Sequence, residues 1–198
     1  MIENKNLEAI FTSLDRQIAV SGGSPIALVV CGGTALAALG LVSRTTKDVD
    51  VLGRLVKGRI RKIGEFPDWL QKAAGKIKRD FRLPENWLNL GPESQLDTGL
   101  PEGLPERLVK KVYGKHLTVH FISRTDQVYF KLYASLDRGG YHVDDLFKLS
   151  PTDAELLNAG RWVLTQDVSA GFRKILLSFL RQHGYNKLAE TIQRNAAG

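Results

Sequence analysis

The sequence predicts an α/β or α+β fold with a helical C-terminal portion, and three patterns support this prediction. Apolar residues at helical spacing begin the chain, short apolar or alternating segments typical of strands follow, and helical spacing returns in the last third. With 198 residues and 43% hydrophobic side chains, the chain is long enough for a packed core. We therefore expect a soluble globular protein of one good-sized domain or two small ones.

Helices and strands alternate in the first part of the chain. Residues 6–20 carry apolar side chains at helical spacing, which predicts an amphipathic helix. Residues 26–31 are apolar on both faces and end at glycines, as in a buried strand. A small-residue helix over residues 34–41 closes at Gly40. Residues 48–52 alternate polar and apolar, which predicts a half-buried strand with both aspartates on one face.

The middle of the chain is less regular. An amphipathic helix is expected over residues 67–81. Two stretches rich in proline and glycine, residues 83–87 and 91–105, are expected to be surface loops. Alternation returns over residues 116–123 and predicts a further strand.

Helical patterns dominate the last third. Thr125 or Asp126 can cap a helix that runs to about Leu136. Two more helical patterns span residues 151–163 and 170–194, the second interrupted by a glycine. The order of elements therefore ends in a run of helices, as the fold class requires.

The positive charge of the chain is concentrated in residues 54–79. The formal net charge is +7, and this segment alone holds nine basic residues against Glu65 and Asp68. The nine are Arg54, Lys57, Arg59, Arg61, Lys62, Lys72, Lys76, Lys78 and Arg79. A patch of this kind attracts polyanions, so nucleic acid is a natural partner. The alternative is a solvated surface that only keeps the protein soluble.

Two classes of protein are excluded by pattern. No apolar run approaches the roughly 20 residues that span a bilayer, and the N-terminus is polar where a secretion signal would be basic and then apolar. We expect a cytoplasmic protein without a membrane partner. Cys31 is the only cysteine, which excludes an intramolecular disulfide and a structural zinc site. A metal would be held mainly by oxygen ligands or histidine.

Asp48 and Asp50 are the first candidate site residues. Two carboxylates side by side on a strand repel each other unless a cation or basic groups compensate them. Mg²⁺ prefers carboxylate oxygens and commonly completes its shell with substrate phosphates. The alternative is two acids on the solvent face of an edge strand.

A glycine pair precedes the acids and strengthens the interpretation. The apolar strand runs directly into Gly32-Gly33 and a helix that begins at Thr34. Glycines permit close backbone approach, and a helix N-terminus offers free N–H groups to a phosphate. The alternative is a tight turn that needs glycine for packing alone.

At this point the sequence resembles the nucleotidyltransferase superfamily of the DNA polymerase β type. Its signature of apolar strand, glycine pair and Asp-x-Asp strand appears here as residues 29–33 and 48–52, with fourteen residues between Gly33 and Asp48. The details Gly-Gly-Thr-Ala-Leu and Arg44-x-Thr46-x-Asp48 look most like the minimal enzymes that include AbiEii-like toxins. The resemblance spans roughly residues 26–149.

The resemblance implies a fold and a domain organisation. The fold is a mixed-sheet core flanked by helices. We assign residues 1–149, with the N-terminal helix, to this nucleotidyltransferase core. Residues 150–198 form the helical C-terminal portion, which is expected to pack on the core.

The resemblance also implies a nucleotide and metal site. Gly32 and Gly33 contact the triphosphate of an NTP such as ATP, while Asp48 and Asp50 bind Mg²⁺ or Mn²⁺. The other nucleotide-binding positions that it implies are Thr34, Arg44, Thr46 and Lys131.

A later motif adds three candidate site residues. Where relatives have a helix with a lysine and an arginine and then an acidic pair, this chain has Lys131, Arg138 and Asp144-Asp145. The resemblance implies that Lys131 contacts phosphate and that Asp144 or Asp145 supports the site. Helical spacing separates a polar stripe that contains Lys131 from an apolar one that contains Leu132. The alternatives are a solvated helix face for Lys131 and helix capping for the two acids.

Two departures from the family pattern concern catalysis. The superfamily often takes a third carboxylate from a later strand, where this chain has His120. A Lys-Asp of the relatives is replaced by Tyr141-His142. His120 could act as a base, although a lone histidine on a strand is more often structural.

The leading hypothesis is therefore a Mg²⁺-dependent nucleotidyltransferase that transfers a nucleoside monophosphate to an acceptor hydroxyl on RNA or tRNA, held by residues 54–79. The family resemblance adds a toxin role with an antitoxin partner. One alternative is a degenerate module that binds nucleotide or RNA without turnover. Another is an enzyme that modifies a small molecule such as an antibiotic, for which an acidic pocket would be expected.

Overall fold

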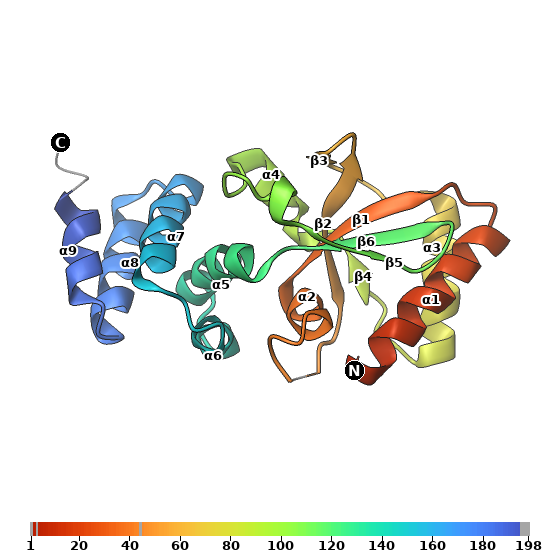
Figure 1. Ribbon diagram of the computed structural model, residues 1–198, viewed down its shortest axis with the longest axis horizontal. Coiled ribbons are helices and arrows are strands. Elements are labelled where there is room, and N and C mark those ends of the chain that lie inside the picture. The colour runs from red at the N-terminus through yellow and green to blue at the C-terminus, as the bar shows by residue number, and fades with distance from the viewer. Residues whose placement is uncertain (1, 3, 44, 195–198) are drawn as a thin grey trace. The chain divides into compact units, whose positions relative to one another are not determined.

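The chain forms two compact units. The first comprises residues 1–97 and 102–123, and the second comprises residues 98–101 and 124–198. The computed structural model describes residues 2, 4–43 and 45–194 (Figure 1). Residues 124–149, which the sequence analysis assigned to the nucleotidyltransferase core, belong to the second unit.

The first unit is built on a mixed sheet of six strands (Figure 1). The strands are β1 (Ile26–Cys31), β2 (Val49–Val56), β3 (Arg59–Arg61), β4 (Leu88–Asn89), β5 (Val109–Val112) and β6 (Leu117–Phe121). Their order is β3-β2-β1-β6-β5, and β4 pairs with the start of β2. Strand β1 is antiparallel to β2 and parallel to β6, which confirms the predicted mixed α+β core.

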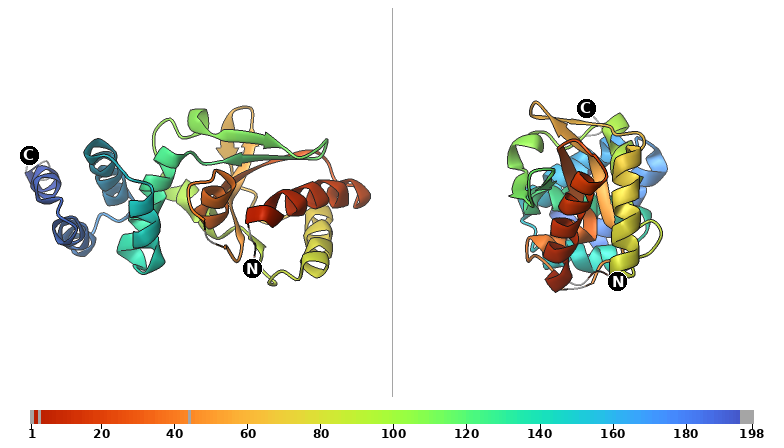
Figure 2. Two further views of the ribbon diagram at one scale, coloured as in Figure 1. Left: turned by 60° about the horizontal axis from the view of Figure 1, so that its bottom comes forward. Right: turned by 90° about the vertical axis from the view of Figure 1, so that its right-hand side faces the viewer.

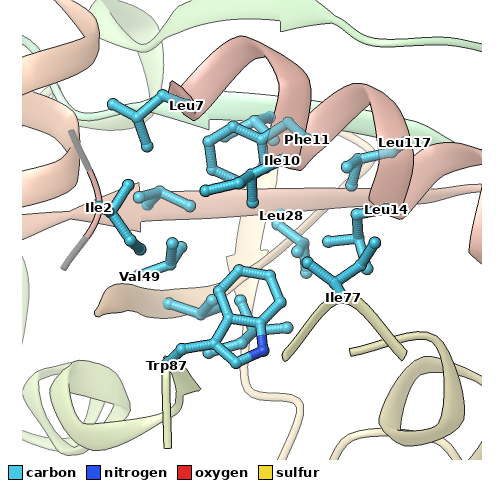
Figure 3. Packing of buried hydrophobic residues seen from close by; sticks show 14 of the residues in the cluster. Ile2, Leu7, Ile10, Phe11, Leu14, Leu28, Val49, Ile77, Trp87 and Leu117 are labelled. Carbon is cyan, nitrogen blue, oxygen red and sulfur yellow. The ribbon is translucent and has the colours of Figure 1, made fainter. Parts of the chain in front are cut away.

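Two helices cover one face of this sheet. Helices α1 (Asn4–Val20) and α3 (Asp68–Phe81) lie next to each other there (Figure 2). Their apolar stripes enter one core together with Leu28, Val49 and Trp87 (Figure 3). Both helices were predicted from the spacing of apolar residues, and both form. The shorter helices are α2 (Gly32–Ala38), η1 (Gly91–Ser94), α4 (Gln95–Thr98) and η2 (Pro105–Arg107).

Strand β2 carries an acidic residue, Asp50, near its start and a basic residue, Arg54, near its end. Val49 and Val51 point into the core, so Asp50 lies on the other face. A β-bulge then shifts the register, because Val51 pairs with Val30 but Gly53 with Val29. After the bulge, the side chains of β2 point to the opposite faces from those that strict alternation would give. The strand continues four residues beyond the predicted end.

Beyond the bulge, β2 and β3 form a hairpin that the sequence analysis did not predict. Its turn is Lys57-Gly58, and both residues have positive φ, 49° and 74°. This is the geometry of a type I′ turn, which usually takes asparagine or glycine at the lysine position. Because lysine is unusual at this position, the sequence did not predict the turn. Strand β5 was missed as well, because all four of its residues are exposed and no alternation marks it.

The second unit is helical. It contains α5 (Arg124–Asp137), α6 (Tyr141–Lys148), α7 (Asp153–Gln166), α8 (Ala170–Gln182) and α9 (Asn186–Arg194). Helix α7 begins with a capping box between Thr152 and Glu155. The predicted break between the last two helices falls at Gly184, whose φ is 86°. Among the described residues, no helix is both long and apolar enough to cross a membrane.

Candidate active site

The glycine pair and the second aspartate meet at the end of β1. Gly32 has a φ of +67°, a conformation that favours glycine. A Cβ atom built on Gly32 would collide with Oδ2 of Asp50. Glycine is therefore required twice, by the backbone and by the carboxylate. Helix α2 has only seven residues, so its N-terminus alone is weak support for a phosphate site. The close approach of Gly32 and the Asp50 carboxylate is stronger support.

Two buried threonines hold the backbone of Asp48. The hydroxyl of Thr34 donates to the Asp48 carbonyl oxygen at 2.6 Å, and that of Thr46 donates to the same oxygen at 3.2 Å. Both threonines were predicted to bind nucleotide; in the structure their hydroxyls donate to the Asp48 carbonyl oxygen, and that of Thr46 also lies 3.5 Å from Asp48 Oδ1. The Asp48 side chain remains partly exposed just before β2.

Asn89 orients the carboxylate of Asp50. Strand β4 places Asn89 beside Asp50 in register, and its Nδ2 donates to Asp50 Oδ1 at 3.2 Å. The Asn89 Oδ1 accepts from the backbone N–H of Gly91 at 2.9 Å, which fixes the amide. The sequence patterns do not identify Asn89, because this strand pairing joins residues far apart in the chain.

The donor set at this position fits a hard divalent cation. Two half-exposed carboxylates, one just before β2 and one within it, offer the oxygen ligands that Mg²⁺ prefers. The space that Gly32 leaves open is filled by a carboxylate oxygen and not by an apolar side chain. Within the described part of either unit, however, no group of three or more His, Cys, Asp or Glu residues could hold a metal ion. Asp48 and Asp50 would therefore depend on water or substrate oxygens to complete a metal shell.

His120 shares the face of Asp50 but lies two strands away. Val119 and Phe121 enter the core, so His120 points to the opposite face, as Asp50 does. It sits on β6, with β1 between it and β2, a lateral separation of about 10 Å. Burial lowers the pKa of His120, and the charge of Lys110, its partner across the strand pair, lowers it further.

In the second unit, Lys131 and Asp145 form a buried ion pair. Lys131 Nζ lies 2.8 Å from Asp145 Oδ2, and the two side chains are 4% and 1% exposed. The ring of Tyr141 lies 5.8 Å from Nζ. The alternative that Lys131 occupies a solvated helix face is wrong, because α6 packs on the polar stripe of α5. Gln127 and Ser135, which belong to the same stripe, are also buried.

The remaining candidates divide by exposure and by position. Asp144 is exposed while Asp145 is buried, so the two acids occupy different environments. Both lie within α6, and the alternative that they cap a following helix is wrong. Gly33 is half-buried in the first turn of α2. Arg44 lies outside the described residues.

The mixed sheet, the glycine turn and the paired aspartates define the core of a nucleotidyltransferase. Residues 5–159 match the family described as nucleotidyltransferase of unknown function (DUF6036), and the chain belongs to this family. Membership confirms the resemblance to nucleotidyltransferases and supports a transferase that acts on a nucleotide. It does not extend to the AbiEii-like group. No curated protein and no solved structure matches the chain.

Proposed function

We propose that this protein is a Mg²⁺-dependent nucleotidyltransferase that transfers a nucleoside monophosphate from an NTP to an acceptor hydroxyl. The contact between Gly32 and Asp50 carries the proposal, because it joins the two parts of the sequence motif in space. Family membership supports the reaction class. The substrate and the metal follow from the chemistry of the acid pair.

The roles of the chain's own residues follow from their contacts. Asp48 and Asp50 would hold the metal, which when bound neutralises charge on the acids and on the phosphate oxygens. Thr34 fixes the backbone of Asp48, and Asn89 orients Asp50. The acceptor hydroxyl releases its proton to water, its oxygen bonds to the α-phosphorus, the bond from the α-phosphorus to the oxygen that bridges to the β-phosphate breaks, and pyrophosphate leaves. The family resemblance assigns Lys131 a phosphate contact, and Asp145 fixes its ammonium group.

We propose RNA as the acceptor, and the β2–β3 hairpin supports this proposal. Arg54 and Arg61 are direct neighbours across the strand pair, an unfavourable arrangement of like charges. Arg59 follows on the same face, and among the described residues no ion pair to these three arginines is formed. A polyanion would supply the missing countercharge.

Geometry further favours a long acceptor over a small molecule. Arg54 lies four residues along β2 from Asp50, a distance of about 13 Å. The bulge places Arg54 on the face of its β1 partner Leu28, opposite to the face of Asp50. Only an extended acceptor such as RNA could contact both the hairpin and the acid pair.

The reaction is tested with purified protein, Mg²⁺, each α-labelled NTP and total tRNA. We expect label on the RNA with at least one nucleotide, and a loss of at least about 100-fold in Asp50→Asn and in Asp48→Ala. Asp137→Asn, which alters an exposed carboxylate of α5, is the control and should retain activity. No transfer with any nucleotide, or equal transfer by the aspartate variants, would overturn the proposal.

The acceptor surface is tested separately by RNA binding at several salt concentrations. Replacing Arg59 and Arg61 by glutamine should reduce the slope of log K against log salt by about 1.5–2. The control replaces Lys76 and Lys78, which already pair with Asp80 and Glu85. If the control changes the slope as much as the hairpin variant does, the hairpin is not the specific contact surface.

A binding module without turnover is the second candidate function. It is favoured by one observation, that no third acidic or histidine ligand joins Asp48 and Asp50 in the described part of the first unit. Calorimetry that detects Mg²⁺-dependent NTP binding while every acceptor stays unlabelled would support it. Any measured turnover that Asp50→Asn abolishes would exclude it.

The resemblance to AbiEii-like toxins extends the main proposal to a toxin role with a protein antitoxin. Expression should then arrest growth, and Asp48→Ala should relieve the arrest. Growth that is equally slow with the variant would point to a cause other than nucleotide transfer.

A further inference from the structure

A pocket of about 370 Å³ opens at the β4 edge of the first unit. One wall is a stripe of α3 that contains Ala74, Gly75 and Lys78, and the other walls come from residues 64–66 and 85–90. Asn89, the residue that orients the Asp50 carboxylate, also lines the pocket. The volume falls within the range of small-molecule sites.

The α3 wall has small residues at Ala74 and Gly75 and is held in place by a tryptophan. The indole Nε1 of Trp87 donates to the Ala74 carbonyl oxygen at 3.1 Å. Trp87 is buried in the core beside α3 (Figure 3). The wall is therefore rigid, and backbone rather than side chains faces the pocket at Gly75.

Packing does not explain why Gly75 is a glycine. It lies in the middle of α3, where glycine is a poor helix former compared with alanine. A Cβ atom at this position would meet only the guanidinium of Arg79, at 4.0 Å. The protein itself thus has room for alanine. What the missing Cβ does provide is open space in the pocket and close approach to the helix backbone.

The hydrogen-bonding groups of the pocket favour a ligand that donates hydrogen bonds. Lys78 Nζ is bound by both carboxylate oxygens of Glu85, at 2.6 and 2.7 Å. Glu65 adds a second carboxylate, which accepts from the amide of Gln71 at 3.3 Å. The Arg79 guanidinium next to Gly75 balances this second negative charge, so the pocket suits a neutral ligand that donates to carboxylate and amide oxygens.

We propose that this pocket binds an unpaired nucleobase with an exocyclic amino group, either of a free nucleoside or of single-stranded RNA. Open space over Gly75 and an apolar rim from Phe66 and Leu90 suit a planar ring. The carboxylate of Glu65 and the amides of Gln71 and Asn86 suit the amino edge of adenine, cytosine or guanine. Asn89 both lines the pocket and donates to the Asp50 carboxylate, so a base bound in the pocket affects the orientation of that carboxylate.

The proposal concerns binding, so it is tested without nucleotide transfer. Adenosine, cytidine, guanosine and uridine are titrated into the full chain by NMR, and the oligonucleotides A₄ and U₄ by fluorescence anisotropy. We expect the three amino-bearing nucleosides to bind at least tenfold more tightly than uridine. Tighter binding of A₄ than of adenosine identifies RNA as the source of the base, and equal binding identifies the nucleoside.

Two variants separate binding from folding. Gly75→Ala should raise Tm by about 2–4 °C and weaken adenosine binding at least fivefold, and Gly75→Leu should abolish binding. Gly171→Ala, at an open helical position of α8 in the second unit, is the matched control that leaves binding unchanged. Glu65→Gln should reduce the preference for adenosine over uridine.

Four results would overturn the proposal. They are no binding of any nucleoside, wild-type affinity in Gly75→Leu, equal affinity for uridine and adenosine, and preferential binding of a non-aromatic polyamine. None of them bears on the transferase proposal, since labelled transfer and its dependence on Asp50 are measured independently.

Discussion

The acid pair of the first unit and the ion pair of the second unit differ in the sign and in the burial of their charges. Asp48 and Asp50 are both negative, both half-exposed, and contacted by neutral donors such as the amide of Asn89. Lys131 and Asp145 are of opposite sign, almost fully buried, and 2.8 Å apart. One region places two like charges side by side near solvent, while the other pairs opposite charges inside the protein.

This difference indicates which charges serve the fold and which are available to a ligand. A buried ion pair costs desolvation, and each of its two charges already has an opposite charge beside it. Two adjacent carboxylates have a cost that a cation removes on binding. The half-exposed pair is therefore the better candidate for metal binding, and each prediction below tests one side of the contrast.

Breaking the buried pair should have the largest effect on stability. Lys131→Met removes the ammonium group that lies 2.8 Å from the buried carboxylate of Asp145 and should cost about 3–5 kcal/mol in the free energy of unfolding. The double variant Lys131→Met/Asp145→Leu should recover most of this loss, because neither charge remains. Urea unfolding of the three proteins measures both values.

The exposed pair Arg138–Asp137 on the same helix provides the control. Arg138→Met should change stability by less than about 1 kcal/mol. If Lys131→Met were as mild as Arg138→Met, the ion pair would be solvated in solution, and the contrast between the two regions would fail.

The next effect concerns the close approach of backbone and carboxylate in the first unit. Gly32→Ala combines an unfavourable φ with a collision against Asp50 Oδ2 and should cost about 2–3 kcal/mol. Gly40 has the same φ of +67° but open space around it, so Gly40→Ala should cost about 1 kcal/mol. Thermal unfolding of the two variants isolates the collision.

A second substitution sharpens this test. In the Gly32→Ala background, Asp50→Ala removes the colliding oxygen and should bring the cost down to that of Gly40→Ala. If the difference between the two glycines persists, the carboxylate is not what requires glycine at position 32.

How much of this could be predicted from the sequence differs between the two regions. Strand β1 and the acids of β2 were predictable, because apolar runs and alternation are local patterns. Asn89 was not, since its contact with Asp50 depends on a strand pairing between distant segments. The alternative that Lys131 faces solvent was wrong, because the sequence of a polar helix stripe does not show whether water or another helix covers it. Only the packing of α6 distinguishes the two cases.

A smaller effect is expected from the repulsion within the acid pair. In the absence of metal, Asp50→Asn should raise stability by up to about 1 kcal/mol, because one of two adjacent charges is removed. Added Mg²⁺ should raise the Tm of the wild type and leave that of the variant unchanged. Equal Mg²⁺ shifts in both proteins would place the metal elsewhere.

The smallest effect is a difference in the pH at which each unit weakens. Burial, helped by Lys110, lowers the pKa of His120 in the first unit, so its contribution is present above the unfolded pKa of about 6.5 and is lost as the pH falls below it. The hydrogen bond from Arg124 lowers the pKa of Glu155 in the second unit, so that contribution is lost only below about pH 4.3.

Between pH 6.5 and 5, amide-exchange protection corrected for intrinsic rates should therefore fall for β6 and hold for α7. His120→Gln should flatten the response of β6, whereas Glu155→Gln should alter α7 alone. A parallel decline of both elements in wild-type protein would mean that the two units unfold as one, and the separate treatment of charge in each would then have no separate effect on stability.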